Sequence, residues 1–306
     1  MSNFEMSHPQ SHAIQTEASP LESQTGNFAV QIWGVRGLIA TSSSDTRRYG
    51  GNTACVEMFV AGKRLIFDGG TGLRILGKSL RNHQKLEAHL FFTNSQSNRI
   101  QGFPFFAPAF IPGNNLHIYG TAASNSASIK QCLYDQMLQP HFSYPLQVMQ
   151  SELQFKNLNP GQGININDVI VTTALINQNQ KSIGYRVNWQ DYSVAYLTDL
   201  SKLTDESDTH SESIAKGILE LTQGVNLLIA NTTYTELTPR KNKDFDFHWE
   251  TALNLAKKSG VKKLVLSQHH PDDDDDFLDG VQAKIKSVFD DVELAHEGLI
   301  LKIDKG

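Results

Sequence analysis

The stretch FFTNSQSNRIQGFPFF, residues 91–106, is the most informative part of the chain. An apolar run that ends at Phe92 leads into the polar cluster Thr93–Arg99, and the chain turns apolar again at Ile100. Many α/β enzymes build a site where a strand stops in evenly spaced polar side chains. Here, however, every side chain of the cluster is an amide, a hydroxyl or a cation. The loop therefore has the form of a site without an acid, a general base or a strong metal ligand.

Short apolar runs bounded by Gly, Asn, Asp or Pro predict many strands on both sides of this loop. The expected strands are 29–33, 54–60, 63–67, 88–92, 116–119, 152–156, 168–175, 183–188, 192–197, 226–230, 262–267, 292–296 and 298–303. The expected helices are fewer, and they are 71–83, 125–138, 209–223, 248–259 and 277–289. Two central sheets with helices on their outer faces would bury both sets of apolar faces, which predicts an αββα sandwich of the α/β class. A doubly wound sheet is the alternative, but many of the strands follow one another with turns alone between them.

Composition limits the organisation of the chain. Residues 1–27 are rich in Ser, Gln, Pro and Glu and lack the basic start and apolar core of a secretory signal, so we predict a disordered tail. No linker or repeat divides residues 28–306, which we expect to form one domain. The formal net charge of -5 gives no broadly basic surface for nucleic acid. No stretch approaches the roughly 18 apolar residues of a membrane span.

The two cysteines indicate a compartment. Cys55 lies in an apolar alternating run and Cys132 in a helical run, so buried free thiols are expected rather than a disulfide. Free thiols fit a reducing compartment, and we expect the protein to be cytoplasmic and not bound to membranes.

Several glycine-rich and apolar phrases, taken in their order and spacing, carry a resemblance to a known family. They are Trp33–Gly37, Tyr49–Thr53, Phe67–Leu73, Ile100–Phe106, Tyr196–Asp199, and Pro271 followed by five aspartates. Together they resemble the metallo-β-lactamase-fold hydrolases, in particular a bacterial branch near ribonuclease Z and related phosphodiesterases, over about residues 28–304. The resemblance implies an αββα sandwich, a hydrolytic site with two zinc ions and, because ribonuclease Z relatives often pair, a possible homodimer.

The resemblance also implies where zinc ligands should stand. In the family, the segment after the fourth strand reads Thr-His-x-His-x-Asp-His, and two further histidines and a bridging aspartate follow later in the chain. In this sequence the bridging aspartate is kept as Asp199, and the other positions carry amides or arginine. The degenerate metal-site positions are Asn94, Gln96, Asn98, Arg99, Gln178, Asp199 and Gln268.

The chemistry of these side chains argues against a zinc site. Zinc prefers imidazole, thiolate or carboxylate ligands, and a carboxamide oxygen is a weak, hard ligand better suited to calcium or magnesium. Those ions need several anionic ligands, and Asp199 alone supplies one. Asn98 cannot act as a general base, and without an ion nothing lowers the pKa of a water. We therefore expect no bound zinc, no other cofactor and no catalytic residue.

Arg99 is the substitution with the clearest physical consequence. An inward guanidinium could replace the metal charge and pair with the buried carboxylate of Asp199, whereas the alternative is an arginine that points to solvent. We favour the inward orientation, with the amides of Asn94, Gln96, Gln178 and Gln268 supplying further hydrogen bonds.

Two other features have a functional and a structural interpretation. His248, His269 and His270 could line the same rim, so that Arg99, Asp199, His248 and His269 are the possible ligand-binding residues. A new zinc site from these histidines has no paired ligand spacing behind it, and loop histidines that form local hydrogen bonds are favoured. The run Asp272–Asp276 lacks the pattern of a calcium loop and is expected to be a solvated loop before a helix.

Two further stretches near the loop are expected to have structural roles. The stretch Phe103–Ile111 is either core or a contact surface, and core is favoured. Asp68 and the glycines after it are expected to make a turn that supports the loop.

Three functional hypotheses follow. The first is a catalytically inactive member of the fold, a pseudoenzyme that acts by binding a partner protein. The second is a sensor that binds a small anionic, phosphate-bearing ligand in the former active-site cleft. The third is a hydrolase or phosphodiesterase with an atypical metal site, since fold alone does not fix function.

Overall fold

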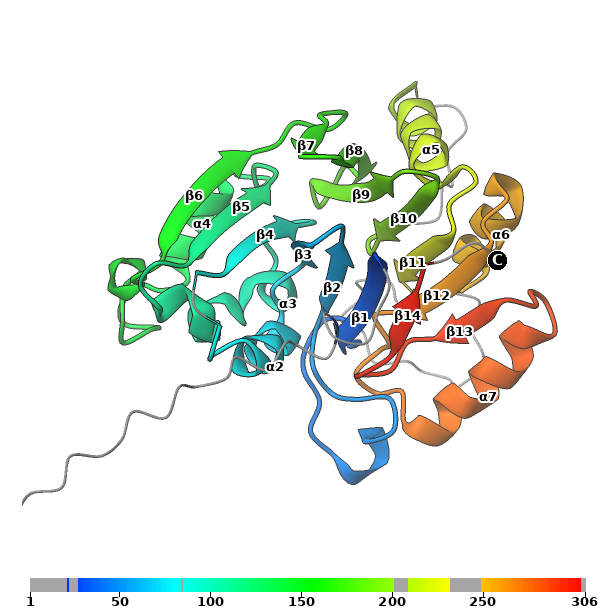
Figure 1. Cartoon of the computed structure of the whole chain (residues 1–306). Helices are drawn as coiled ribbons and strands as arrows, with labels where there is room; N and C mark the ends of the chain where they lie inside the picture. Colours follow the sequence, from blue (N-terminus) through cyan, green and yellow to red (C-terminus); the bar gives the residue numbers. More distant parts are fainter. Residues whose placement is uncertain (1–20, 22–26, 84, 201–208, 232–248, 304–306) are drawn as a thin grey trace, which may run out of the picture.

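The predicted αββα sandwich is confirmed. The computed structural model describes residues 21, 27–83, 85–200, 209–231 and 249–303, and two seven-stranded sheets lie face to face with helices on their outer faces (Figure 1). One apolar cluster fills the space between the sheets, and a second and a third lie between each sheet and its helices.

The first sheet has the strand order β14-β1-β2-β3-β4-β5-β6. Its strands are β1 (Phe28–Gly34), β2 (Cys55–Val60), β3 (Lys63–Phe67), β4 (Glu87–Phe92), β5 (Asn115–Gly120), β6 (Glu152–Asn157) and β14 (Ile300–Lys302). The pairs β1·β2 and β2·β3 are antiparallel, and β3 to β6 run parallel. The carboxyl ends of β3 and β4 therefore meet at one edge, where residues 68 and 93 begin the loops of the site.

The second sheet has the order β13-β12-β11-β10-β9-β8-β7. Its strands are β7 (Ile164–Ile166), β8 (Val169–Asn177), β9 (Ser182–Trp189), β10 (Tyr192–Leu197), β11 (Leu227–Asn231), β12 (Lys263–Ser267) and β13 (Val292–Leu294). The strands β7 to β10 are antiparallel, and β10 to β13 are parallel. The ends of β10 and β12 carry Asp199 and Gln268 toward the first sheet's loops.

The helices follow the apolar faces that the sheets leave uncovered. They are α2 (Thr71–Ser79), α3 (Ser97–Ile100), α4 (Ile129–Asp135), α5 (Thr209–Thr222), α6 (Glu250–Ser259) and α7 (Asp275–Lys286). Short 3-10 turns lie at Ser44–Thr46, Phe103–Phe105, Ala107–Phe110 and Leu146–Val148. Residues of α2 and α4 pack on the first sheet, and residues of α5, α6 and α7 pack on the second.

Every predicted strand and helix overlaps an observed one, and the differences have local causes. The helix predicted at 125–138 begins at Ile129, because Ser128 caps it with its side-chain oxygen. The helix predicted at 277–289 begins at Asp275, because the carboxylate of Asp274 accepts the N–H of Phe277. Two short elements, β7 with three residues and α3 with four, are absent from the predicted elements.

The acidic run 272–276 differs from the solvated loop that we expected. Asp273 and Asp275 are buried, and the carboxylate of Asp275 accepts the backbone N–H groups of Arg48 and Tyr49. The run thus ties the loop before β2 to the start of α7, and its carboxylates lie at a helix N-terminus as predicted.

The stretch 103–111 is largely core, as favoured. Phe103, Phe106 and Ala109 are buried, whereas Phe105 and Phe110 are exposed at 54% and 36%. The stretch therefore contributes both to the core under α2 and to the surface.

The N-terminal tail falls almost wholly outside the described residues. Leu21, the one described position before residue 27, is buried. Cys55 and Cys132 are free thiols, as predicted. Among the described residues, no helix has the length and apolar character that crossing a bilayer requires.

Candidate functional site

The loop after β4 is held against the loop after β3 by the backbone. The N–H of Gly69 donates to the carbonyl of Arg99, and the N–H of Gly102 donates to the carbonyl of Gly69. A Cβ on Gly102 would lie 1.9 Å from the carbonyl oxygen of Gly70, so glycine is required for this approach. The contact places α3, with Arg99 in its last turn, directly over the ends of β3 and β10.

Arg99 points inward and pairs with Asp199, so both predictions about its orientation and partner are confirmed. Its side chain is 3% exposed, and Nη2 donates to Asp199 Oδ1 at 3.1 Å and to the carbonyl of Thr198 at 3.1 Å. Nη1 donates to Gln268 Oε1 at 2.8 Å. The guanidinium thus joins the loop after β4 to the ends of β10 and β12.

Asp68, which we expected to support the loop as part of a turn, supplies a second carboxylate. Its Oδ2 lies 3.4 Å from Arg99 Nη1, and its carboxylate accepts hydrogen bonds from the N–H and hydroxyl of Thr93 and from the hydroxyl of Tyr196. The signal in the sequence was its position directly after β3, since parallel neighbouring strands bring their carboxyl ends together. We call Asp68, Arg99, Asp199, Asn94 and Gln268 the Arg99 network.

Burial and charge act against each other in this network. Burial raises the pKa of Asp68 to about 6, although Arg99 and the hydrogen bonds from Thr93 act to lower it. Burial also acts to lower the pKa of Arg99, but the carboxylates of Asp199 and Asp68 outweigh it and raise that pKa above its ordinary value. Arg99 therefore stays charged, and Asp68 takes up a proton at a higher pH than an ordinary aspartate does.

The amides complete the network, as expected for two of them. Asn94 Nδ2 donates to Asp199 Oδ2 and to Ser182 Oγ, both at 2.9 Å, and Asn94 Oδ1 accepts the N–H of Gln96. Gln268 adopts a positive φ of 63°, which aims its side chain at Arg99. Ser182 at the start of β9 was not predicted, and nothing in its sequence context marks it.

The remaining predicted positions lie elsewhere or play a backbone role. Gln96 occupies the N-cap position of α3 without a capping hydrogen bond from its side chain and is half-buried, and Asn98 is buried within α3. Gln178 is exposed in the turn after β8. Among the described residues, Asn94 and Arg99 donate hydrogen bonds to the Asp199 carboxylate, and the hydrogen bond expected from Gln178 is absent. His248 lies outside the described residues.

His269 lies in the core and not at a ligand-binding rim. It is fully buried, its Nε2 donates to the carbonyl of Ala295 at 2.8 Å, and its ring meets the edge of Tyr49 at 5.7 Å. Burial lowers its pKa to about 4, which keeps the ring neutral. His270 accepts the N–H of Asp272 at Nδ1. The interpretation that these histidines form local hydrogen bonds is confirmed for both, and a ligand role of His269 stays a prediction.

The Arg99 network does not fit the zinc ions of the resembling family. A guanidinium lies between the two carboxylates, and the remaining side chains around it are neutral amides and hydroxyls. A dication placed there would meet a fixed positive charge and weak amide ligands instead of imidazoles. The donor set therefore gives no zinc centre at this place.

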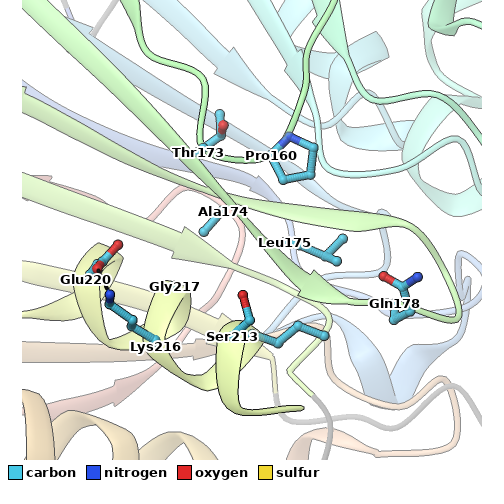
Figure 2. A pocket seen from close by; sticks show the side chains of 11 residues that line it. Pro160, Thr173, Ala174, Leu175, Gln178, Ser213, Lys216, Gly217 and Glu220 are labelled. Carbon is cyan, nitrogen blue, oxygen red and sulfur yellow. Dashed lines mark ion pairs between the residues drawn. The ribbon is translucent and has the colours of Figure 1, made fainter. Parts of the chain in front are cut away.

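Gln178 instead lines a pocket between β8 and α5. The pocket has a volume of about 410 Å³, and Figure 2 shows Gln178 and Leu175 on one side and Ser213, Lys216 and Glu220 of α5 on the other. Lys216 Nζ lies 3.9 Å from Glu220 Oε1, so the positive charge at the rim is already partly neutralised.

Comparisons with known proteins agree on the fold. No protein-family model and no curated protein sequence matches the chain. Solved structures do. The metallo-β-lactamase fold protein YhfI from Bacillus subtilis is 15% identical with a TM-score of 0.60, and the match covers 90% of this chain and 99% of that one. A diphosphatase from the PhnP family is 15% identical with a TM-score of 0.61, and the match covers 90% of this chain and 98% of that one.

A third structure extends the likeness to another activity. The short form of human tRNase Z (ELAC1) is 15% identical with a TM-score of 0.57, and the match covers 90% of this chain and all of that one. At such low identity the agreement concerns the fold, and these neighbours have different activities. Together with the two facing sheets and their outer helices, the matches establish that this chain has the metallo-β-lactamase fold.

Proposed function

We propose that this chain is a pseudoenzyme of the metallo-β-lactamase fold, which acts by binding and not by hydrolysis. The observation that carries the proposal is the position of the Arg99 guanidinium, 3.1 Å from Asp199 and 3.4 Å from Asp68. In the resembling family the aspartate at position 199 bridges two zinc ions. Here the Arg99 guanidinium neutralises this carboxylate. Unlike a metal ion, a guanidinium has no open coordination position for a water or a substrate.

The surface around α4 supports a protein partner. Five large apolar side chains of segments 105–110 and 138–148 are at least 36% exposed, and they are Phe105, Phe110, Leu138, Tyr144 and Val148. The ring of Phe105 meets that of Phe142 at 5.6 Å, and the N–H of Gln150 donates to the carbonyl of Ala109, so the two segments are neighbours. Grouped exposed apolar side chains are typical of interaction surfaces. The free thiols Cys55 and Cys132 favour a cytoplasmic setting.

The sensor hypothesis remains a second candidate, but its ligand would bind at a different place from the former active-site cleft that we expected. Both terminal nitrogens of Arg99 already donate to protein oxygens, and one cation faces two carboxylates, so an anion would gain little from the Arg99 network. The pocket of Figure 2 has the volume of a small-molecule site. Lys216 at its rim is the group that a phosphate-bearing ligand would contact.

A turnover assay tests the pseudoenzyme. We expect bis-p-nitrophenyl phosphate to be hydrolysed no faster than in a blank, with or without added zinc or manganese. Hydrolysis that depends on added metal and disappears in Asp199→Asn would overturn the proposal. The same Asp199→Asn protein serves as the control for a contaminating phosphatase, because a contaminant would keep its rate.

A thermal-shift screen separates the two binding hypotheses. A phosphate-bearing ligand in the pocket should raise the melting temperature of the wild type and not that of Lys216→Ala. Lys257→Ala, on α6 and away from this pocket, is the matched control. Failure of every compound to raise the melting temperature leaves the protein-binding proposal as the better supported one.

A further inference from the structure

A second cluster of polar side chains lies at the opposite end of β4 and β5 from the Arg99 network. Glu87 and His89 are two residues apart on β4, so both side chains point to the same face of the sheet. His117 on β5 is the direct register partner of His89 in the parallel pair. These strands therefore place one carboxylate and two imidazoles side by side (β4 and β5 in Figure 1).

The three side chains converge on one point. Nε2 of His89 and Nε2 of His117 lie 3.9 Å and 3.5 Å from the same carboxylate oxygen, Glu87 Oε1. One ligand atom from each of the three residues lies within 4.8 Å of those of the other two. The two rings stack with centroids 4.6 Å apart and planes 10° apart, so one imidazole has to turn about its side-chain bonds for both ring planes to contain the same ion.

The buried imidazole nitrogens indicate that something else belongs at this point. His89 is 5% exposed, and its Nε2 has no hydrogen-bond partner among the residues that the structure describes. The same holds for Nε2 of His117, whose side chain is 20% exposed. Buried polar atoms without a partner are rare, because leaving one unsatisfied costs its full desolvation. Two of them aimed at one carboxylate oxygen are best explained by a ligand that accepts all three lone pairs.

The hydrogen bonding of the other ring nitrogen of His89 fits metal coordination. A neutral imidazole is the form that coordinates a cation. His89 Nδ1 lies 3.2 Å from the hydroxyl of Tyr119, and a proton on Nδ1, donated to that oxygen, leaves the lone pair on Nε2.

We propose that Glu87, His89 and His117 form a binding site for one divalent transition-metal ion, zinc in the first place. Two imidazoles and one carboxylate are a ligand set that zinc takes, with a water in the fourth position, and magnesium or calcium would prefer oxygen ligands alone. Tetrahedral zinc sets its ligand atoms about 3.3 Å apart. The observed separations of 3.5 Å and 3.9 Å to Glu87 Oε1 approach this value, and the half-exposed Glu87 side chain can move to close the rest.

The site has an entry path and a competing cation. The Glu87 side chain is 49% exposed, so an ion can reach the cluster from solvent. Lys63 Nζ lies 3.4 Å from Glu87 Oε2, the other oxygen, so that Oε1 is left for the metal. Lys63→Ala should therefore strengthen metal binding, since it removes the charge that repels a dication.

This proposal revises our expectation that the chain holds no metal, and it does not depend on the pseudoenzyme proposal. The ion would join β4 to β5 at the end remote from Asp199 and would bring no substrate to the Arg99 network. Turnover and zinc stoichiometry therefore report on the two proposals separately.

Metal titration of the full chain after chelator treatment tests the site. We expect one zinc per chain by calorimetry at pH 7.5, and visible absorption bands of tetrahedral cobalt when Co²⁺ replaces zinc. Glu87→Gln and His117→Gln should each weaken zinc binding by at least about tenfold and abolish the cobalt bands. His141→Gln, which changes an exposed histidine outside the cluster, is the matched control and should bind as the wild type does.

Two results would overturn the proposal. One is that the wild type binds no zinc at 100 µM metal, which is on the order of the concentration at which a weak site would fill. The other is zinc binding that stays unchanged in both Glu87→Gln and His117→Gln, which would place the ion on other histidines. Far-ultraviolet circular dichroism without metal checks folding, and Glu87→Gln decides if His117→Gln is unfolded, since position 87 is exposed.

Discussion

Arg99 pairs with two buried carboxylates, so its removal should affect both. We predict that Arg99→Ala lowers the free energy of unfolding by about 3–5 kcal/mol, because it leaves Asp68 and Asp199 buried without a counter-ion. Urea denaturation provides the measurement. Arg48→Ala, which removes exposed ion pairs to Asp276 and Asp279, should cost much less.

Multiple substitutions separate the network from simple packing. Arg99→Met combined with Asp199→Asn should recover part of the loss, and adding Asp68→Asn should recover more, since the second carboxylate would otherwise stay unpaired. Strictly additive losses in these variants would show that the three side chains do not interact energetically.

The pKa of Asp68 predicts a specific pH dependence. Its folded-state pKa of about 6 lies above the ordinary value of 3.8, so between these pH values the folded chain holds a proton that the unfolded chain has lost. The stabilisation from this group is complete below about pH 4 and is lost as the pH rises through 6. The stability of Asp68→Asn relative to wild type should therefore increase from pH 4 to pH 6 and stay constant above pH 7.

The comparison with Asp68→Asn is needed because other groups titrate in the opposite sense. His89 and His269 have folded-state pKa values of about 4, below the ordinary 6.5, so their contribution to stability grows as the pH rises through this window. Urea titrations of both proteins at pH 4, 5, 6 and 7 cancel these common terms. A difference that does not change with pH would contradict the assignment.

At this scale the sequence predicted the site only in part. The pairing of Arg99 with Asp199 could be expected, because a carboxylate at the end of an apolar strand needs a counter-ion and the altered motif offers one arginine. The second carboxylate, Asp68, could not be separated from a turn residue without knowing that β3 and β4 are parallel neighbours. The core position of His269 depends on a packing contact with β1 and β2 loops that no local pattern records.

At the scale of elements, the loops after β3 and β4 pack closely because the residues at their contact are glycines, which have no side chain. A methyl group on Gly102 would meet the carbonyl of Gly70, and one on Gly70 would meet Thr53 Oγ1 at 2.4 Å. We predict that Gly102→Ala lowers the free energy of unfolding by about 1–3 kcal/mol, because the backbone has to shift. Gly163→Ala is the control, since its nearest atom is 4.0 Å away. Equal melting temperatures of the two variants would show that the loops can move apart freely.

Most of the elements that the sequence predicted have apolar patterns over four or more residues, and the predicted segments 292–296 and 298–303 are longer than the three-residue strands β13 and β14 that form there. The missed β7 and α3 have three and four residues, too few for a period to be visible. They are formed by tertiary contacts, since β7 pairs with β8, and α3 is held by the loop after β3.

At the scale of the whole molecule, the first strand of the sandwich begins at Phe28, and the segment before it should contribute to stability only near Leu21. We expect deletion of residues 1–20 to leave the melting temperature unchanged, because they offer few apolar side chains for packing. Deletion of residues 1–27 should lower it, because the buried side chain of Leu21 is lost. Equal melting temperatures of both truncated proteins would show that Leu21 contributes no stability.

The strand at the end of the first sheet has a consequence for how copies of this chain meet. β6 lies at one end of the first sheet among the described strands, and its side chains Glu152, Gln154 and Lys156 are exposed and polar. Charged side chains on an open edge oppose the addition of a foreign strand, which is how sheet proteins avoid fibrous aggregation. A homodimer should therefore form through another face. Light scattering should detect self-association of a Glu152→Val/Lys156→Val variant at concentrations at which the wild type stays monodisperse. Equal scattering from both proteins would show that these charges do not prevent strand addition.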